Sequence, residues 1–306
     1  VVVKRLLPHL AHREEFTTML MDEARISSQL KHPNIVSVLD FGQEREHLFL
    51  AMEYVPGCNL GYLGRRVGWR FPAALAAYIG SEICQALDYA HAKQDDHGRP
   101  MCIIHRDVNP PNVLIGFDGR VMLADFGIAK AAERATETVF GAIKGKIDSM
   151  SPEQLLNQII DCRADIFAKG TLLYELLSGT HPFHRNDNEK TKAAILAGDA
   201  IPPSAHKMRV DKELDDICMR ALSLRAADRF ATAGDMRAAL QRWLATQDPM
   251  GAPELQAFVD HVFFGDEAHQ EDLDEVADSL EDSPDAINNR TLTGMPALIP
   301  GAGRSL

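Results

Sequence analysis

The residues that could carry chemistry in this chain of 306 residues gather in one stretch. His105-Arg106-Asp107-Val108-Asn109-Pro110-Pro111-Asn112 is followed by the apolar run Val113-Leu114-Ile115 and then by Asp125-Phe126-Gly127. An aspartate five residues before an asparagine on one loop can aim a carboxylate at a hydroxyl group, while the asparagine amide oxygen binds a cation. A second aspartate on a glycine turn can complete a Mg²⁺ site, because Mg²⁺ prefers carboxylate, amide and phosphate oxygens. Phosphoryl transfer needs this combination of positioned hydroxyl, metal and phosphate clamp.

The elements that must position these groups fall into two sets. Residues 1–6, 35–41 and 47–54 read as strands, and a helix expected over 12–30 ends before Pro33, which cannot continue it. Apolar residues at helical spacing predict helices over 71–92, 166–177, 190–197, 212–223 and 234–244. A small β-rich part followed by a mainly helical body predicts an α+β fold in two lobes.

Composition and charge exclude several other classes of protein. The formal net charge is −12, of which residues 249–306 carry −10, so the body is near neutral and lacks the clustered cations of a nucleic-acid binder. No apolar run reaches eighteen residues and no secretory signal opens the chain, so we expect no membrane span and a cytoplasmic location. Five scattered cysteines without a CxxC pair, and twelve histidines without an HExxH spacing, favour reduced thiols over zinc or disulfides.

In order and spacing, the motifs resemble those of the protein kinase superfamily, specifically the eukaryotic-like (Hanks-type) serine/threonine kinases of bacteria. Any one of these motifs is weak evidence, whereas the ordered set over about residues 1–244 is specific. Besides the catalytic stretch it comprises Val1-Val2-Val3-Lys4, Glu23 nineteen residues later, His32-Pro33-Asn34-Ile35-Val36, Met52-Glu53-Tyr54-Val55, Ser151-Pro152-Glu153, Asp165-Ile166-Phe167-Ala168-Lys169-Gly170 and Asp228-Arg229-Phe230.

The resemblance implies a two-lobed kinase domain over 1–248, with an N-lobe over about 1–57 and a C-lobe over about 58–248. The family places two strands and a glycine-rich phosphate loop before the strand lysine, and no such loop precedes Lys4. We therefore expect the chain to begin inside the fold, as a fragment or from a misplaced start, with an N-lobe that lacks the first two strands. A GTG start codon translated literally would also give Val1.

The resemblance also implies roles for the polar residues. Lys4, fixed by Glu23, contacts the ATP phosphates, and Asp107 orients the substrate hydroxyl while Asn112 and Asp125 hold Mg²⁺. Read without the family, Lys4 could be an edge-strand lysine kept for solubility, and the other three could be turn-forming residues.

Further roles concern adenine and the scaffold. The main chain of Glu53 and Val55 is expected to pair with adenine, while Val2 and Leu114 cover its two faces. Glu153 with Arg229, and Asp165, are expected to serve architecture: the pair holds the activation segment, and the aspartate braces the catalytic loop.

The chain departs from the family pattern inside the catalytic loop. Asn109 replaces the lysine that usually touches the transferring phosphate, and we hypothesise that Lys146 supplies the missing charge; a solvated basic loop is the alternative. Ser149 replaces a frequent tyrosine, so peptide preference cannot be inferred. Arg106 is expected to bind a phosphate on Thr136 or Thr138 in the active enzyme, unless it pairs with an acid instead.

The C-terminal part is expected to be an amphipathic helix over 249–265 and an acidic, disordered tail over 266–306, with the helix docked on its own lobe or on a partner. The whole predicts a signalling kinase that transfers the ATP γ-phosphoryl group to serine or threonine hydroxyls of protein substrates with Mg²⁺. Two rivals remain. A nucleotide-binding pseudokinase or scaffold would explain Asn109, and a small-molecule kinase of similar fold would lack the Ser-Pro-Glu motif that is present.

Overall fold

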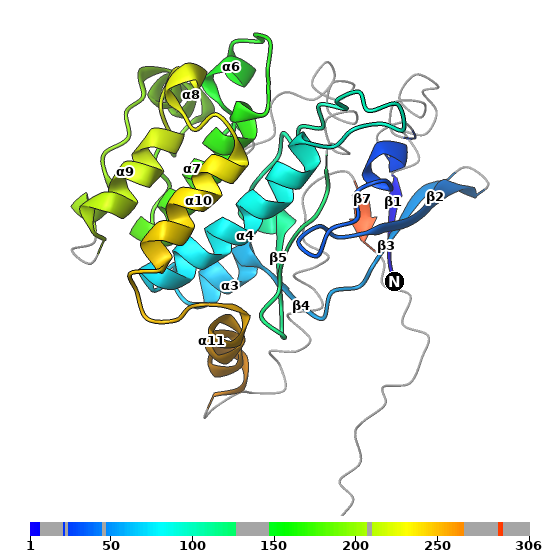
Figure 1. The fold of residues 1–306 in the computed structure, drawn as a ribbon, viewed down its shortest axis with the longest axis horizontal. Coiled ribbons are helices and arrows are strands. Elements are labelled where there is room, and N and C mark those ends of the chain that lie inside the picture. The colour runs from blue at the N-terminus through cyan, green and yellow to red at the C-terminus, as the bar shows by residue number, and fades with distance from the viewer. Residues whose placement is uncertain are drawn as a thin grey trace, which may run out of the picture.

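The computed structural model describes residues 1–6, 21, 24–44, 47–126, 147–206, 210–265 and 287–289. They form a small sheet on one side and a helical body on the other, with the strands β4 (Gly57–Asn59) and β5 (Val113–Gly116) between them (Figure 1). The predicted α+β architecture in two lobes is therefore confirmed.

The small lobe is built on a four-stranded sheet in the order β2-β3-β1-β7. Its strands are β1 (Val2–Leu6), β2 (Val38–Glu44), β3 (His47–Met52) and β7 (Ile287–Asn289). All pairings are antiparallel, and Lys4 lies opposite Leu50. The first predicted strand agrees with β1, whereas β2 begins three residues later than expected, because Ile35 makes an isolated bridge to Leu123 instead.

One face of this sheet covers a separate apolar cluster. Its buried members are Ala24, Val36, Leu50, Met52, Val55, Met122 and Ala124, and Val2, Val38, Phe41 and Leu114 pack against them. Of the helix predicted over 12–30, the structure describes Met21 and residues 24–27 as helical, whereas residues 28 and 29 form a turn, so the helix ends three residues earlier than expected. Residues 12–20 and 22–23 lie outside the described part of the chain.

The large lobe is helical around a three-stranded sheet in the order β4-β5-β6. The strands are β4 (Gly57–Asn59), β5 (Val113–Gly116) and β6 (Val121–Leu123). The helices are α3 (Leu60–Arg66), α4 (Ala73–His91), α6 (Pro152–Leu155), α7 (Arg163–Ser178), α8 (Asn188–Ala197), α9 (Lys212–Ala221), α10 (Ala233–Leu244) and α11 (Ala252–Phe264). The five helices predicted in this lobe from apolar spacing agree with α4, α7, α8, α9 and α10 to within about three residues, whereas α3 was missed.

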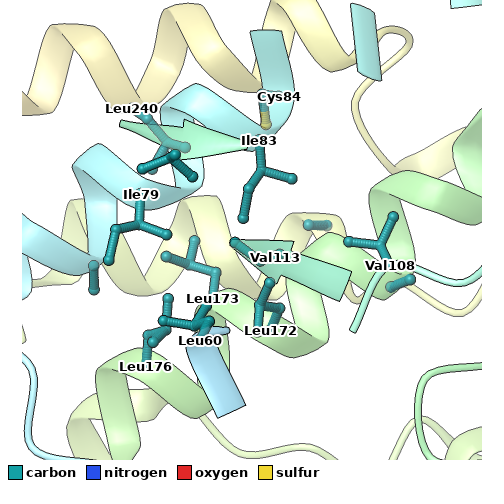
Figure 2. Packing of buried hydrophobic residues seen from close by; sticks show 14 of the residues in the cluster. Leu60, Ile79, Ile83, Cys84, Val108, Val113, Leu172, Leu173, Leu176 and Leu240 are labelled. Atoms are coloured by element: carbon teal, nitrogen blue, oxygen red, sulfur yellow. The ribbon is translucent and has the colours of Figure 1, made fainter. Parts of the chain in front are cut away.

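The core of the large lobe lies where α4, α7 and α10 meet β5, and Figure 2 shows its side chains converging from these elements. Leu173 on α7 and Val113 on β5 are 0 % exposed. Val108, directly after Asp107, is equally buried and belongs to the same cluster. The loop that carries the candidate catalytic aspartate is therefore anchored by its own apolar residue.

The amphipathic helix expected over 249–265 is observed as α11, and it packs on its own lobe through Leu255, Val259 and Phe263. Of the range 266–306, the structure describes only β7, which pairs with the edge of β1. Within the described part of the chain, no helix combines the length and apolarity that a membrane crossing requires.

Candidate active site

The loop 105–112 is shaped by a local cap and an unusual backbone conformation. Arg106 has φ 70°, in the left-handed region that few residues with a Cβ adopt. The short 3₁₀ turn Pro110–Asn112 begins after Asn109, whose side-chain oxygen accepts the Asn112 N–H at 3.1 Å. Proline at the first position of that turn costs no hydrogen bond. The sequence Asn-Pro-Pro-Asn thus closes the loop on itself.

The Asp107 carboxylate is held by two amide donors. Asn109 Nδ2 donates to Oδ1 at 2.9 Å, and Asn112 Nδ2 donates to Oδ2 at 2.9 Å. Asn112 Nδ2 also donates to the Asp107 carbonyl at 2.9 Å, so its amide orientation is fixed. Asn112 Oδ1 has no partner in the described part of the structure and is available to bind a cation. The structure brings Asp107 and Asn112 together as expected.

Asp165 braces the same loop from α7. It is fully buried, and its carboxylate accepts the main-chain N–H groups of His105 at 2.8 Å and Arg106 at 2.7 Å. It also bonds His91 Nε2 at 2.8 Å. Burial alone would raise the Asp165 pKa, but the hydrogen bond and charge of His91 and the loop donors outweigh it and hold the pKa below its ordinary value. The carboxylate is therefore ionised and fixed.

The His105 ring links this loop to the segment that carries Asp125. Its Nδ1 accepts the Asp107 N–H at 3.2 Å, so Nε2 carries the proton and donates to the Ala124 carbonyl at 2.8 Å. The ring also meets Phe126 edge-on at 4.5 Å between centroids. Sequence reasoning assigned His105 no such role.

Lys4 and Asp125 join the two lobes. The ammonium group of Lys4 on β1 forms an ion pair and hydrogen bond with the Asp125 carboxylate, and both side chains are less than a fifth exposed. Asp125 has φ 63°, in the left-handed region of the backbone. The strand lysine is thus aimed into the cleft, which disfavours the reading of an edge lysine kept for solubility.

Residues 53–55, which we call the hinge, follow β3 of the small lobe and lead to β4 of the large lobe. Glu53 is tied to Ser37 twice: its N–H donates to the Ser37 carbonyl at 3.0 Å, and its carboxylate accepts the Ser37 N–H at 2.9 Å. From the Glu53 main chain, only the carbonyl remains for a ligand. Val2 and Leu114 both pack on the apolar cluster of the small lobe that contains Val55.

A model of the protein kinase domain matches residues 1–244. The chain belongs to the protein kinase family. It is 35 % identical over 275 residues to "Tyrosine-protein kinase MasK" of Myxococcus xanthus, a match that covers 89 % of this chain and 42 % of that protein. It is 34 % identical over 254 residues to "Serine/threonine-protein kinase PknB" of Mycobacterium leprae, with 81 % and 39 % covered. The crystal structure of the Mycobacterium tuberculosis PknI kinase domain has a TM-score of 0.61 at 28 % identity, covering 80 % of this chain and 85 % of that one.

These matches confirm the bacterial Hanks-type kinase family and the two-lobed kinase fold. This kinase chain spans about two fifths of the length of the curated relatives. The relatives differ in the acceptor that their names state, tyrosine in one and serine or threonine in the other.

The kinase scaffold pair Glu153 and Arg229 is also in place. Arg229 donates from Nη1 to Oε1 at 2.7 Å and from Nη2 to Oε2 at 2.9 Å, and it further donates to the carbonyls of Arg163, Ser223 and Leu224. The pair fixes the end of the segment after the catalytic stretch onto the large lobe.

Four predicted site residues lie outside the described part of the chain: Glu23, Thr136, Thr138 and Lys146. Arg106, the expected partner of a phosphate on Thr136 or Thr138, is described. Its Nε is buried and has no hydrogen-bond partner in the part of the chain that the structure describes. The double role of Asn109 and the bond from His91 to Asp165 were missed by sequence reasoning. An asparagine before Pro-Pro is an N-cap signal that could have revealed the first.

Proposed function

We propose that this kinase transfers the γ-phosphoryl group of ATP to serine and threonine hydroxyls of proteins in bacterial signalling. The observation that carries the proposal is the Asp107 carboxylate, fixed by Asn109 and Asn112 beside a cation-binding amide oxygen. If Asp107 only formed a turn, its carboxylate would not need hydrogen bonds from the side-chain amides of both Asn109 and Asn112. This arrangement supports an enzyme over a pseudokinase.

Each group has a part in the transfer. Asp107 orients the incoming hydroxyl and accepts its proton as the new bond to phosphorus forms. Lys4 leaves Asp125 and contacts the ATP phosphates, while the Glu53 carbonyl and the Val55 main chain bind adenine between Val2 and Leu114. Asp107 is held by Asn109 and Asn112 before substrate arrives, so it needs little reorganisation, whereas Lys4 must first break its ion pair with Asp125.

A Mg²⁺ ion fits the oxygen donors that the site offers. Asn112 Oδ1 and the Asp125 carboxylate would hold it, once Lys4 has moved to the phosphates. The ion supplies charge neutralisation on the transferring phosphoryl group. A group of only two protein ligands suits Mg²⁺, which commonly completes its shell with phosphate oxygens and water.

Two regulatory elements belong to the same proposal. Arg106 binds a phosphate on Thr136 or Thr138, and Thr138, nearer the centre of its segment, is the preferred position. Mass spectrometry of active enzyme should find phosphate there, and a fully active, unmodified Thr136→Ala/Thr138→Ala protein would refute the switch. Lys146 contacts the transferring phosphate, so Lys146→Ala should lower kcat far more than it raises the KM for ATP.

A second acceptor class is favoured by one comparison. The match to a protein named as a tyrosine kinase covers 89 % of this chain at 35 % identity. Transfer to tyrosine uses the same Asp107 geometry, with a longer acceptor side chain. Phosphoamino-acid analysis of the autophosphorylated kinase distinguishes phosphoserine and phosphothreonine from phosphotyrosine.

The decisive experiment measures radiolabel transfer from ATP with Mg²⁺ by the chain joined to the two strands and the glycine-rich loop that the family places before Lys4, and by the same protein with Asp107→Asn. We expect label on serine or threonine, and a loss of about 10²–10⁴-fold in the variant. Equal labelling in both proteins would refute the assignment. Nucleotide binding without any transfer by the extended chain would favour the pseudokinase.

A further inference from the structure

Helix α11 lies beyond the residues that match the kinase family, yet it is built into the large lobe. The family match ends at Leu244, and α11 begins at Ala252. Leu255, Val259 and Phe263, four residues apart, are 0, 0 and 2 % exposed. Figure 1 shows α11 at the end of the large lobe near α3. One complete face of the helix is therefore buried against the hinge side of this lobe.

Phe263 is the centre of that contact. Its ring stacks on Tyr62 of α3 at 5.9 Å between centroids and meets Phe117 edge-on at 5.8 Å. The Arg66 guanidinium lies 5.2 Å from the centre of the same ring, and Arg66 Nε donates to the Val262 carbonyl at 3.3 Å. Phe263 of α11 thus contacts both α3 and the turn after β5 through one aromatic ring.

This aromatic contact leads directly to the hinge. The Phe117 N–H donates to the carbonyl of Pro56, the residue between the hinge and β4, at 2.9 Å. Strand β4 then pairs with β5, placing Asn59 opposite Leu114. A Cβ on Gly57 would lie 2.1 Å from the Ile115 carbonyl oxygen, so the two backbones are in close contact. A displacement of Phe117 therefore moves Pro56, at the end of the hinge, together with Leu114.

The start of α11 contacts the same hairpin from its other end. Gly119, with φ 77°, packs its Cα against the backbone of α11, where an added Cβ would lie 1.9 Å from the Ala252 carbonyl oxygen. The β5–β6 turn is thus fixed at Phe117 by a ring and at Gly119 by the main chain. Two separate contacts restrict how the turn can tilt.

We infer that α11 is a positioning element for nucleotide binding, with Phe263 as its positioning residue. Helix α11 holds two residues in the geometry that adenine requires: Pro56, where the chain leaves the hinge, and Leu114, which covers one face of the adenine. The helix itself touches no reacting atom. The inference rests on the proposed function in one respect, namely that the cleft between the lobes binds ATP. A helix that lies outside the family match would in this way set the nucleotide affinity of this kinase.

The test compares Phe263→Ala with Ile195→Ala, using the full chain. Ile195 on α8 is also 0 % exposed, so its truncation destabilises the lobe without touching the hinge. The dissociation constant for Mg²⁺-ADP, measured by titration calorimetry, should rise about 2- to 30-fold in Phe263→Ala and stay unchanged in Ile195→Ala. Amide hydrogen exchange at residues 56–59 and 114–117 should accelerate only in Phe263→Ala.

Phe263→Leu provides a milder variant, for which we expect a smaller rise in the same direction even where the alanine protein folds poorly. An unchanged dissociation constant and unchanged exchange in a folded Phe263 variant would overturn the inference. If the wild-type chain binds no nucleotide, the proposed function fails, whereas the exchange experiment still decides whether α11 controls the hinge.

Discussion

Arg229 and Glu153 are joined by two parallel hydrogen bonds of 2.7 and 2.9 Å, although 76 residues separate them in the chain. The Arg229 side chain is fully buried and that of Glu153 is 11 % exposed. Burial opposes ionisation of Glu153, but the bonds from Arg229 outweigh it and lower the pKa of the carboxyl below its ordinary value. Helix α6, which carries Glu153, is thereby fixed to the large lobe by a charged pair.

Removing one partner of this pair should be costly. Arg229→Met leaves Glu153 buried without its cation, so we expect the free energy of unfolding at pH 7 to fall by about 3–5 kcal/mol in urea titrations. Because the pKa of Glu153 is lower in the folded state, this stabilisation is present above the ordinary pKa of 4.5 and is lost as the pH falls through the folded value. The double variant Glu153→Gln/Arg229→Met should lose less than the sum of the two single variants. Equal stability of Arg229→Met and wild type would contradict the prediction.

Asn109 offers a way to separate its two roles. Asn109→Asp keeps the oxygen that caps the Pro110–Asn112 turn but replaces the amide donor to Asp107 with a like charge. We expect nearly unchanged thermal stability with a kcat at least about tenfold lower, since a misoriented base loses much of general base catalysis. Asn109→Ala should show both effects, with about 0.5–2 kcal/mol lost from the missing cap. Full activity in Asn109→Asp would show that Asp107 is oriented by Asn112 alone.

The order of motifs was enough to predict the fold and the pairing of Asp107 with Asn112. Helices with regular apolar spacing, such as α4 and α10, were predicted nearly to the residue because that spacing reflects one buried face. The short α3 was missed because its glycines, at 61 and 64, are poor helix formers and tertiary contacts decide its conformation. The small strand β6, with only three residues, is defined mainly by its partner β5.

Contacts between distant residues were harder to predict. The link from Lys4 to Asp125 spans 121 residues and depends on how the two lobes face each other. The bond from His91 to Asp165 depends on the packing of α4 on α7, which no local pattern encodes. The partner helix of α11 could not be chosen from its amphipathic pattern, because such a pattern identifies a buried face without identifying what covers it.

Lys169 is a buried lysine whose replacement should stabilise the kinase. Its side chain is in the core between α4 and α9, and its Nζ has no hydrogen-bond partner in the described ranges. Burial lowers the pKa of this ammonium group, against smaller opposing effects of Cys84 and Cys218. Lys169→Met fills a similar volume without a polar atom, so we expect about 1–3 kcal/mol more stability at pH 7 in urea titrations.

The pH dependence gives an independent check on Lys169. The pKa of Lys169 is lower in the folded state than its ordinary value of 10.5. Below pH 10.5 the unfolded chain therefore binds this proton more tightly than the folded chain, and wild-type stability rises as the pH rises toward that value. The difference between Lys169→Met and wild type should therefore shrink as the pH is raised from 7 toward 10. Lys190→Met, at a position 71 % exposed, serves as the control and should show no such trend. A difference that is constant with pH would mean that Lys169 is protonated in the folded core.

Glu175 should make stability depend on pH in the opposite sense. Burial and the nearby charge of Asp148 raise its pKa to about 7, against the smaller effect of His184. Between pH 4.5 and 7 the folded state therefore binds the proton more tightly, and wild-type stability should fall as the pH rises through this range. Glu175→Gln should remove about 3 kcal/mol of that fall. The exposed Glu189→Gln is the control, and a pH profile unchanged in Glu175→Gln would contradict the assignment.

The left-handed backbone of Arg106 and Asp125 limits how this kinase can be improved by engineering. Both residues have a Cβ at positive φ, a backbone conformation that glycine adopts at a lower free-energy cost. A redesign guided only by thermal stability would replace them with glycine or asparagine and would lose the Arg106 guanidinium and the Asp125 carboxylate that pairs with Lys4. Sequences selected for heat resistance and sequences selected for turnover are thus expected to diverge first at these two positions.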